Sequence, residues 1–240
     1  MRKFLRLLAA ALAFSSAIGT ASAQVMTFEN PDTTYASSYP FLGHTDALVE
    51  GDYAVQMFNT KAGAQPGDLV GAVMDQNSCF SVQCPTNNPT NFLGSLNDGV
   101  PAFFRLDGGA FNLTQFDASF IGADGVSVPD TSMVLRLIGV DAFGVQSQED
   151  VLLPGLVNGA LSFSTYALST TFASTAFKAV DVYGYACDAT GSCSRGLNLG
   201  QFGLDNVTFA TPVPEPSTWA LLCLGLIGIA VIRRRATAKA

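Results

Sequence analysis

Few side chains in this 240-residue sequence could act as a catalytic base or nucleophile. His44, in the stretch FLGHTDAL, is the one histidine of the chain, so a Ser-His-Asp triad would have to use it. The GxSxG turn that presents the nucleophile of many serine hydrolases is absent. The single histidine also excludes metal sites with several histidine ligands. We therefore expect His44 to have no catalytic role.

Carboxylates are the remaining source of acid–base chemistry, because a glycosidase uses two of them about 5 to 10 Å apart. The chain between its two ends holds 18 Asp or Glu residues, of which only Glu29, Glu50 and Glu149 are glutamates. Many pairs are conceivable, and nothing around these residues singles out an acid and a base. A glycan hydrolase or lyase is the least supported function, and we expect a protein that is not an enzyme.

Four of the five cysteines form two close pairs, CFSVQC with Cys79 and Cys84, and CDATGSC with Cys187 and Cys193, and the fifth, Cys223, lies in the C-terminal segment. In an exported protein, an even number of clustered cysteines indicates disulfides. Four cysteines allow three pairings, and we favour the local one because each pair brackets a turn-rich loop. Zinc is the alternative, which the spacing disfavours because four or five residues separate each pair instead of the usual two, with no histidine near.

The N-terminus has the order of a secretory signal peptide. Basic residues precede an apolar run at residues 7–18, and the small residues ASA at 21–23 suit a signal peptidase. We predict a signal peptide over residues 1–23, with the mature chain beginning at or near Gln24.

The region between the signal peptide and the C-terminal segment is acidic. It contains five Lys or Arg residues against 18 Asp or Glu, a net charge of −13. A surface of this charge repels phosphate backbones, so nucleic acid is not an expected partner. The charge suits a protein that is soluble outside the cell or that binds calcium.

Any site in this region must be positioned by β-strands. Short alternating runs rich in Val, Phe, Thr and Tyr recur between Gly, Asn, Asp and Pro, without a sustained helical period. The expected strands are residues 25–29, 52–58, 101–106, 110–122, 132–140, 161–168, 177–187 and 202–210. Such strands without helices between them predict an all-β fold, a single antiparallel β-sandwich of the jelly-roll kind over residues 24–211.

Turn residues support the same fold. Gly108 and Gly109 lie between two alternating runs, as a hairpin requires, and Asp124-Gly125 is a second expected turn. Residues 85–98, PTNNPTNFLGSLND, are rich in Asn and Pro, and they predict a long surface loop held by the first disulfide.

The C-terminal segment VPEPSTWALLCLGLIGIAVIRRRATAKA contains 15 uncharged residues, 218–232, which span about 22 Å as a helix. A bilayer core of about 30 Å needs roughly 20 apolar residues, so this transmembrane helix is short for a lasting span. The arginines that follow it place the tail in the cytoplasm and the body outside. The residues allow a permanent anchor, a sorting signal or, least favoured, a buried helix of the body.

The same segment resembles the PEP-CTERM protein-sorting domain, also called an ice-binding protein C-terminal domain. The likeness covers the tail at 212–240 and has three parts in chain order. The first is Pro214, Glu215 and Pro216, the second is the apolar helix at 218–232, and the third is Arg233, Arg234 and Arg235. The second family name describes the tail and implies no ice binding by the body.

The resemblance implies a route for the protein. A signal peptidase and an exosortase act as its partners in export, and the exosortase recognises the tail near Pro-Glu-Pro and releases the helix. The precursor is then anchored in the inner membrane of a Gram-negative bacterium with its body in the periplasm. The product reaches the cell surface or extracellular matrix, in association with exopolysaccharide or biofilm.

The two ends of the body, TFEN at residues 27–30 and LDNVTF at 204–209, resemble the terminal strands of jelly-roll carbohydrate-binding modules. This second resemblance implies a structural calcium ion as the one candidate cofactor. Its ligands would be Glu29 and Asp205, assisted by Asp32 or Asn206. Calcium takes six to eight oxygens, including main-chain carbonyls, so two carboxylates can suffice. The alternative is that Asp205 and Asn206 form a turn or strand-edge pair with exposed side chains.

The expected function is that of a non-enzymatic surface or matrix protein, and the alternative is a carbohydrate-binding module for the exopolysaccharide. Sugar binding needs exposed aromatic rings, and the body offers six tyrosines and no tryptophan. The best candidate loop is NPDTTYASSYPF at residues 30–41, which contains Tyr35 and Tyr39. The alternative for these tyrosines is packing on the edge of the sandwich.

Overall fold

The computed structural model describes residues 23–77, 79, 82–122, 132–196 and 198–211. Ala23–Thr211 form one compact unit. The predicted signal peptide up to residue 22, the sorting tail and the Asp124-Gly125 turn lie outside the described residues. Within the described ranges, no helix has the length and apolar character needed to cross a bilayer.

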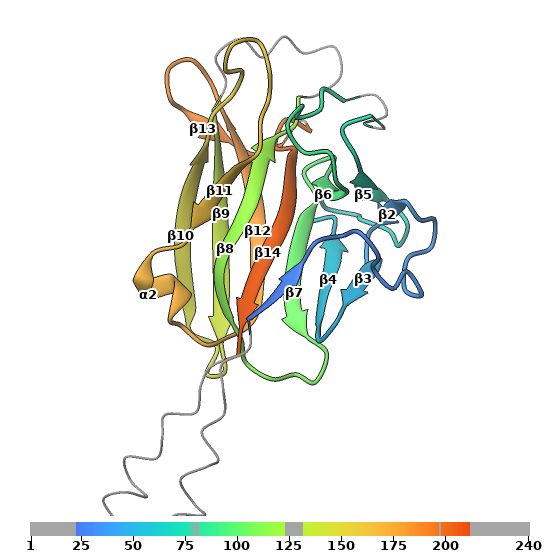
Figure 1. Ribbon diagram of the computed structural model, residues 1–240, viewed down its shortest axis with the longest axis vertical. Helices are drawn as coiled ribbons and strands as arrows, with labels where there is room; N and C mark the ends of the chain where they lie inside the picture. The colour runs from blue at the N-terminus through green and yellow to red at the C-terminus, as the bar shows by residue number, and fades with distance from the viewer. Residues whose placement is uncertain (1–22, 78, 80–81, 123–131, 197, 212–240) are drawn as a thin grey trace, which may run out of the picture. The chain divides into compact units, whose positions relative to one another are not determined.

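Two seven-stranded sheets, with antiparallel pairing throughout, make up this unit (Figure 1). The β14 sheet has the order β11 (Ser164–Ala167), β8 (Asn112–Phe120), β14 (Phe202–Ala210), β6 (Phe92–Ser95), β5 (Leu69–Met74) and β2 (Phe41–Gly43), and β1 (Ala23–Met26) also pairs with β14. The β12 sheet has the order β10 (Gln146–Leu153), β9 (Met133–Asp141), β12 (Phe177–Cys187), β7 (Val100–Arg105), β4 (Tyr53–Phe58) and β3 (Ala47–Glu50), and β13 (Cys193–Ser194) also pairs with β12. The short helix α2 (Thr170–Ala173) lies between β11 and β12.

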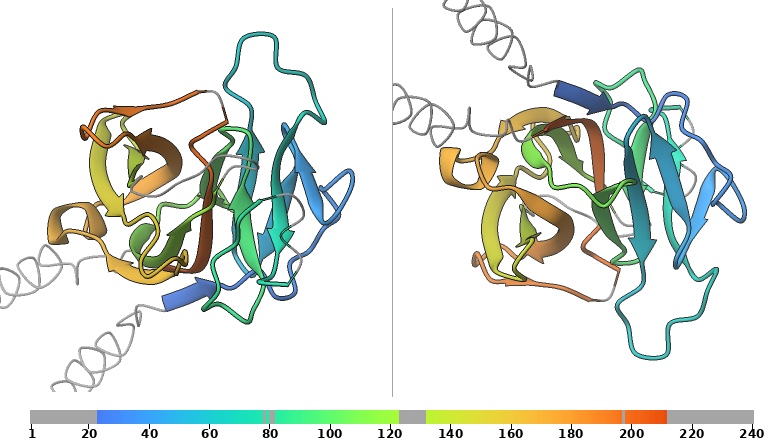
Figure 2. Two further views of the ribbon diagram at one scale, coloured as in Figure 1. Left: turned by 90° about the horizontal axis from the view of Figure 1, so that it is seen from above. Right: turned by 90° about the horizontal axis from the view of Figure 1, so that it is seen from below.

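From β6 onward the chain passes back and forth between the sheets in the manner of a jelly roll, while the hairpins β9–β10 and β12–β13 each stay within one sheet. The strands β6, β14, β8 and β11 are neighbours in one sheet, and β7, β12, β9 and β10 are neighbours in the other. This is the eight-strand arrangement of two Greek keys, and the pairs β5–β2 and β4–β3 extend its two sheets. Figure 2 shows the layering from above and below. The predicted fold, an all-β antiparallel sandwich of the jelly-roll kind, is confirmed.

The core lies between the sheets because the strands alternate inward and outward residues. In β9, Met133, Leu135 and Leu137 are buried, whereas the residues between them are half-buried on the outer face. Aromatic rings fill the centre, where Tyr53 stacks on Phe209 with ring centroids 4.1 Å apart. The sheets are therefore held by apolar burial between them. A second buried cluster, which includes Met74, Phe92 and Ile121, packs separately on the β14 sheet.

The sequence did not predict six of the strands, namely β2, β3, β5, β6, β10 and β13. The prediction of one long surface loop at residues 85–98 is wrong, because this range contains the strand β6, all four residues of which are buried. Gly94 has no side chain to mark the strand, and a Cβ atom there would collide with Met74 Cε. The edge strand β10 contains Glu149 and Asp150, residue types that are uncommon in strands, so its composition did not indicate a strand.

The predicted hairpin at Gly108 and Gly109 is also corrected. The turn exists, with Gly108 N–H donating to the Arg105 carbonyl at 3.1 Å and Gly108 at φ +66°. It nevertheless joins β7 of one sheet to β8 of the other, so these two strands are not paired. A glycine turn fixes a reversal of the chain, but it does not decide which sheet the next strand enters.

Candidate functional site

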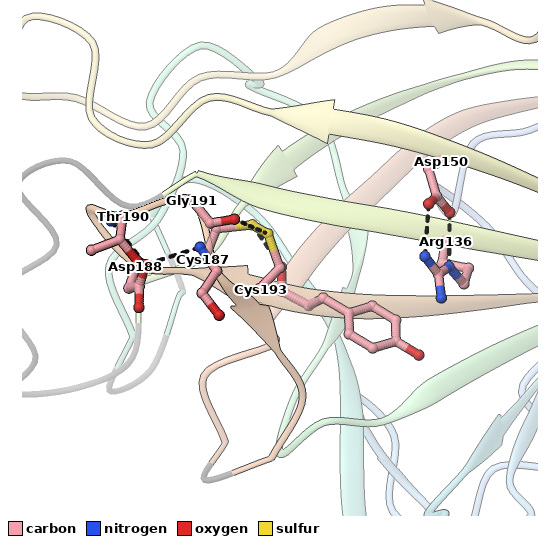
Figure 3. The surroundings of a disulfide bond; sticks show 9 residues. Arg136, Asp150, Cys187, Asp188, Thr190, Gly191 and Cys193 are labelled. Atoms are coloured by element: carbon pink, nitrogen blue, oxygen red, sulfur yellow. Dashed lines mark hydrogen bonds and ion pairs between the residues drawn. A yellow bond between two sulfur atoms is a disulfide. The ribbon is translucent and has the colours of Figure 1, made fainter.

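The structure joins the predicted cysteine pairs, Cys79 with Cys84 and Cys187 with Cys193. Cys187 ends β12 and Cys193 begins β13, and the two residues are direct partners in the strand pairing (Figure 3). The second disulfide therefore closes a short hairpin. The zinc alternative is wrong for these four residues, because their sulfurs are bonded to one another.

The two predicted calcium ligands contact one short segment, residues 88–91. The Asp205 carboxylate is buried on β14 and accepts hydrogen bonds from Asn88 Nδ2 at 2.8 Å and Thr90 Oγ1 at 3.3 Å. Glu29 is exposed and accepts from the Asn91 backbone N–H at 2.8 Å. The alternative of an exposed Asp205 side chain is wrong. The structure thus places both residues against the same segment, through separate hydrogen bonds.

The two assisting residues lie elsewhere in the hydrogen-bond network. Asp32 Oδ1 accepts from the backbone N–H of Thr34 at 2.9 Å. Asn206 has φ +48° and donates from Nδ2 to Asp117 Oδ2 at 2.8 Å, across from β14 to β8. No group of three or more His, Cys, Asp or Glu side chains that could hold a metal occurs among the described residues. The calcium site stays a prediction.

Burial raises the pKa of the Asp205 carboxyl to about 6. Hydrogen bonds from Asn88, from the Asn206 backbone and from Thr90 act in the opposite direction, and the nearby Asp117 charge adds a small increase. Desolvation outweighs these bonds because the side chain is almost completely removed from water. The charge of Asp205 is therefore sensitive to mildly acidic pH.

His44 and the glutamates have structural partners. His44 Nδ1 accepts the Asn59 backbone N–H at 3.0 Å, so this histidine fixes the loop after β4. Each glutamate accepts a backbone N–H from a different segment, and the donors are Asn91 for Glu29, Thr27 and Phe28 for Glu50, and Ser169 for Glu149. These contacts give each glutamate a structural role, because its carboxylate holds a backbone segment in place.

A groove of about 460 Å³ lies on the outer face of the β12 sheet. Its floor is formed by outward-facing residues of β4, β7 and β12 and one end by the loop after β4. The lining consists of Gln56, Phe58, Asn59, Thr60, Val100, Ala102, Phe104, Ala179, Asp181 and Tyr183. The lining combines three aromatic rings with amide, hydroxyl and carboxylate groups.

Strand register creates this groove. Gln56 of β4 is opposite Ala102 of β7, which is opposite Asp181 of β12, so these three residues form one row across the sheet. In the adjacent row, Phe104 is opposite Ala179. The two alanines leave room between larger neighbours, because a methyl side chain rises little above the sheet. The hollow is therefore built into the sheet face, where the strands hold its lining in fixed positions.

Charged side chains frame one end of the groove. Asp181 is half-buried, and its pKa is raised by burial, with the hydrogen bond from Tyr183 acting the other way. The Arg195 guanidinium lies over the Tyr183 ring, 5.2 Å from its centroid, and donates to Thr60 Oγ1 at 2.6 Å. Arg195 thus fixes Thr60 and the Tyr183 ring, both of which line the groove.

The aromatic surface continues along β12 beyond the groove. Tyr185 lies under the Arg136 guanidinium, at 5.1 Å from the ring centroid. Arg136 also makes a two-pronged contact with Asp150 at 2.9 and 2.8 Å, visible in Figure 3 beside the disulfide. The hydrogen bonds with Asp150 raise the pKa of Arg136. Two cation–π pairs therefore order the tyrosines on the outer face of this sheet.

The tyrosines of the loop at residues 30–41 lie apart from the lining of this groove. Tyr35 and Tyr39 are 64% and 45% exposed, but neither lines the groove. The groove residues Asp181 and Tyr183 occupy alternate positions of β12. They could be assigned to a site only once it was known that these positions face outward and which strands lie beside them.

The class of protein follows from the tail and the fold together. Residues 212–235 match the PEP-CTERM protein-sorting motif. The chain is therefore an exported β-sandwich protein that carries the sorting signal of an exosortase substrate, as the sequence predicted. No curated protein sequence matches the chain.

Solved structures give distant likenesses. A DUF4465 family protein from Bacteroides caccae has a TM-score of 0.46 and 14% identity, over 78% of this chain and 98% of that one. The CBM51-2 and INT domains of Clostridium perfringens ZmpB, solved with GlcNAc, have a TM-score of 0.32 and 8% identity, over 79% and 40% of the two chains. A family 11 carbohydrate-binding module from Clostridium thermocellum, in complex with a β-1,3-1,4-mixed-linked tetrasaccharide, has a TM-score of 0.23 and 7% identity, over 81% and 99%. None of these likenesses transfers a ligand to this chain.

Proposed function

We propose that this chain is a non-enzymatic exported protein that binds exopolysaccharide at the cell surface or in the extracellular matrix. The observation that carries the proposal is the groove on the outer face of the β12 sheet. Binding of a matrix polysaccharide would give a surface protein its adhesive role, so the proposal unites the two functions expected from the sequence.

The lining of the groove suits a sugar chain. Pyranose rings have apolar C–H faces that pack on aromatic rings, and their hydroxyl groups need a few well-placed polar partners. Phe58, Phe104 and Tyr183 supply rings, and Gln56 and Asp181 supply polar atoms within the same hollow. Because these residues come mainly from strands, the site is formed before the ligand arrives and little ordering entropy is lost on binding.

The groove favours binding over hydrolysis. A glycosidase of the usual kind needs two carboxyl groups on either side of the scissile bond. Among the described residues that line the groove, Asp181 is the single carboxylate. A sugar bound there meets one acidic side chain and no partner to complete an acid–base pair, which supports a non-enzymatic role.

The proposed route divides the chain into three parts. Residues 1–23 are the signal peptide, 24–211 the binding domain and 212–240 the sorting tail. The helix at 218–232 holds the precursor in the inner membrane with the body in the periplasm, until an exosortase acts near Pro-Glu-Pro. The match of residues 212–235 to the sorting motif supports this route.

Filling the groove tests the proposed function. Ala102→Phe places a ring on the groove floor, and we expect it to weaken polysaccharide binding at least about tenfold, or about 1.4 kcal/mol. Gln115→Phe is the matched control, because it adds the same ring at an exposed position of β8 on the other sheet. Pull-down with exopolysaccharide and a glycan array measure binding, and circular dichroism checks the fold. Wild-type binding by a folded Ala102→Phe protein would refute the proposal.

A further inference from the structure

Asp181 has an unusual position for a carboxylate. It lies in the middle of β12, opposite Ala102 on one side and Ile138 on the other. It is half-buried within the groove, whose lining near it also includes Ala179 and Tyr183. A charge among such neighbours is poorly solvated, and its burial is costly unless a partner compensates it.

That compensation is weak in the described structure. The Tyr183 hydroxyl donates the one hydrogen bond to Asp181, at 3.5 Å, which is the limit of the interaction. No Lys or Arg among the described residues lies within ion-pair distance of this carboxylate. The groove therefore presents a negative charge that lacks a positive partner.

The two arginines on this face are already engaged. Arg136 is paired with Asp150 at 2.8 Å. Arg195 donates to Thr60 Oγ1 and to the backbone carbonyl of Asp98. Neither side chain can neutralise Asp181 without giving up these bonds, so a positive partner has to come from the ligand.

We propose that the groove binds a glycan containing amino sugars with a free ammonium group, which pairs with the Asp181 carboxylate. The inference rests on the proposed function and specifies the ligand. A charge-assisted N⁺–H···O⁻ bond in this half-buried hollow is stronger than a neutral one. The Phe104 ring lines the same hollow, and an aromatic ring attracts a cation placed over its face.

Electrostatic repulsion disfavours glycans that contain uronic acids. A uronic acid would bring its carboxylate against Asp181, in a domain that already has five basic and 18 acidic residues. A lysine side chain of a protein partner offers the same ammonium group, but it makes no use of the hydroxyl and amide groups of Thr60 and Gln56. The lining therefore favours the amino sugar over the lysine.

The test uses the full chain, purified in mild detergent from the membrane fraction of a host without an exosortase. Calorimetry compares a glucosamine tetrasaccharide, its N-acetylated form and a glucuronic acid tetrasaccharide, and a lysine-rich peptide serves as a competitor. Asp181→Asn keeps the shape of the side chain and removes its charge. Asp52→Asn is the matched control, because it makes the same change in net charge in the exposed turn between β3 and β4.

We expect the glucosamine tetrasaccharide to bind best and the glucuronic acid form worst. Asp181→Asn should weaken binding of the glucosamine form about tenfold and change binding of the N-acetylated form less than about twofold. Asp52→Asn should leave both unchanged, and high salt should weaken only the glucosamine form. Tighter binding of the N-acetylated form, equal losses in the two variants, or full displacement by the lysine-rich peptide would overturn the inference.

The two proposals fail in different ways. If Ala102→Phe leaves binding of every oligosaccharide unchanged, or none binds, the groove is not a glycan site and the proposed function is lost. If Ala102→Phe abolishes binding while Asp181→Asn has no effect on the glucosamine form, the groove is a glycan site with another specificity. In that case only the role of Asp181 is wrong.

Discussion

The buried Asp205 carboxyl makes the stability of the body depend on pH in a direction that can be measured. Its pKa is about 6 in the folded protein, against an ordinary value of 3.8. The folded state thus holds this proton more tightly than the unfolded state does. The stabilisation is complete below about pH 4 and is lost as the pH rises through about 6.

The size of the effect follows from the shift. A difference of about two pKa units corresponds to roughly 3 kcal/mol of unfolding free energy lost between about pH 4 and pH 8. Asp205→Asn removes this dependence, but it costs about 1 kcal/mol because the amide nitrogen cannot accept a bond as the carboxylate oxygen does from Asn88 or Asn206. The variant should be less stable than the wild type at pH 4 and more stable at pH 8.

Urea unfolding of residues 23–211 between pH 4 and 8, in EDTA, measures this crossover. Circular dichroism is the suitable probe, because the single tryptophan of the chain, Trp219, lies in the tail. Glu29→Gln is the control, since it removes an exposed carboxylate that bonds to the same segment. A difference between wild type and Asp205→Asn that stays constant across this pH range would refute the reasoning.

The same titration, repeated with calcium, tests the predicted metal site. Calcium bound by ionised Asp205 would raise stability at pH 8 in the wild type and not in Asp205→Asn, by mass action on the folded state. Equal midpoints in calcium and EDTA would remove Glu29 and Asp205 as ligands.

Two further predictions concern the core and the processing of the chain. The Tyr53 hydroxyl is buried and has no hydrogen-bond partner among the described residues. Tyr53→Phe should therefore raise the unfolding free energy by about 1 kcal/mol, because the ring stays stacked on Phe209 and no polar group is left buried without a partner. A loss of stability in urea unfolding would show that the hydroxyl does find a partner. The intact mass of the exported protein should correspond to a chain that begins near Gln24 and lacks residues 219–235, and a mass that retains them would make the tail a permanent anchor.

Much of the fold was predictable because the longer strands alternate clearly. The expected strand at 177–187 coincides with β12, and that at 202–210 coincides with β14. The missed strand β6 has only four residues, all buried, so alternation could not mark it. β10 lies at a sheet edge, where charged side chains are tolerated and resemble those of a loop.

The sequence by itself determined the sorting tail and the class of fold and favoured the observed cysteine pairing, because each depends on residues that are close together in the chain. Only the tertiary structure showed which residues come together to form the groove. Gln56, Ala102 and Asp181 form one row only through the register of β4, β7 and β12, and a shift of one residue would turn Asp181 into the core. Long-range strand register is set by the packing of the whole sandwich, so the proposed binding site could not be read from local patterns.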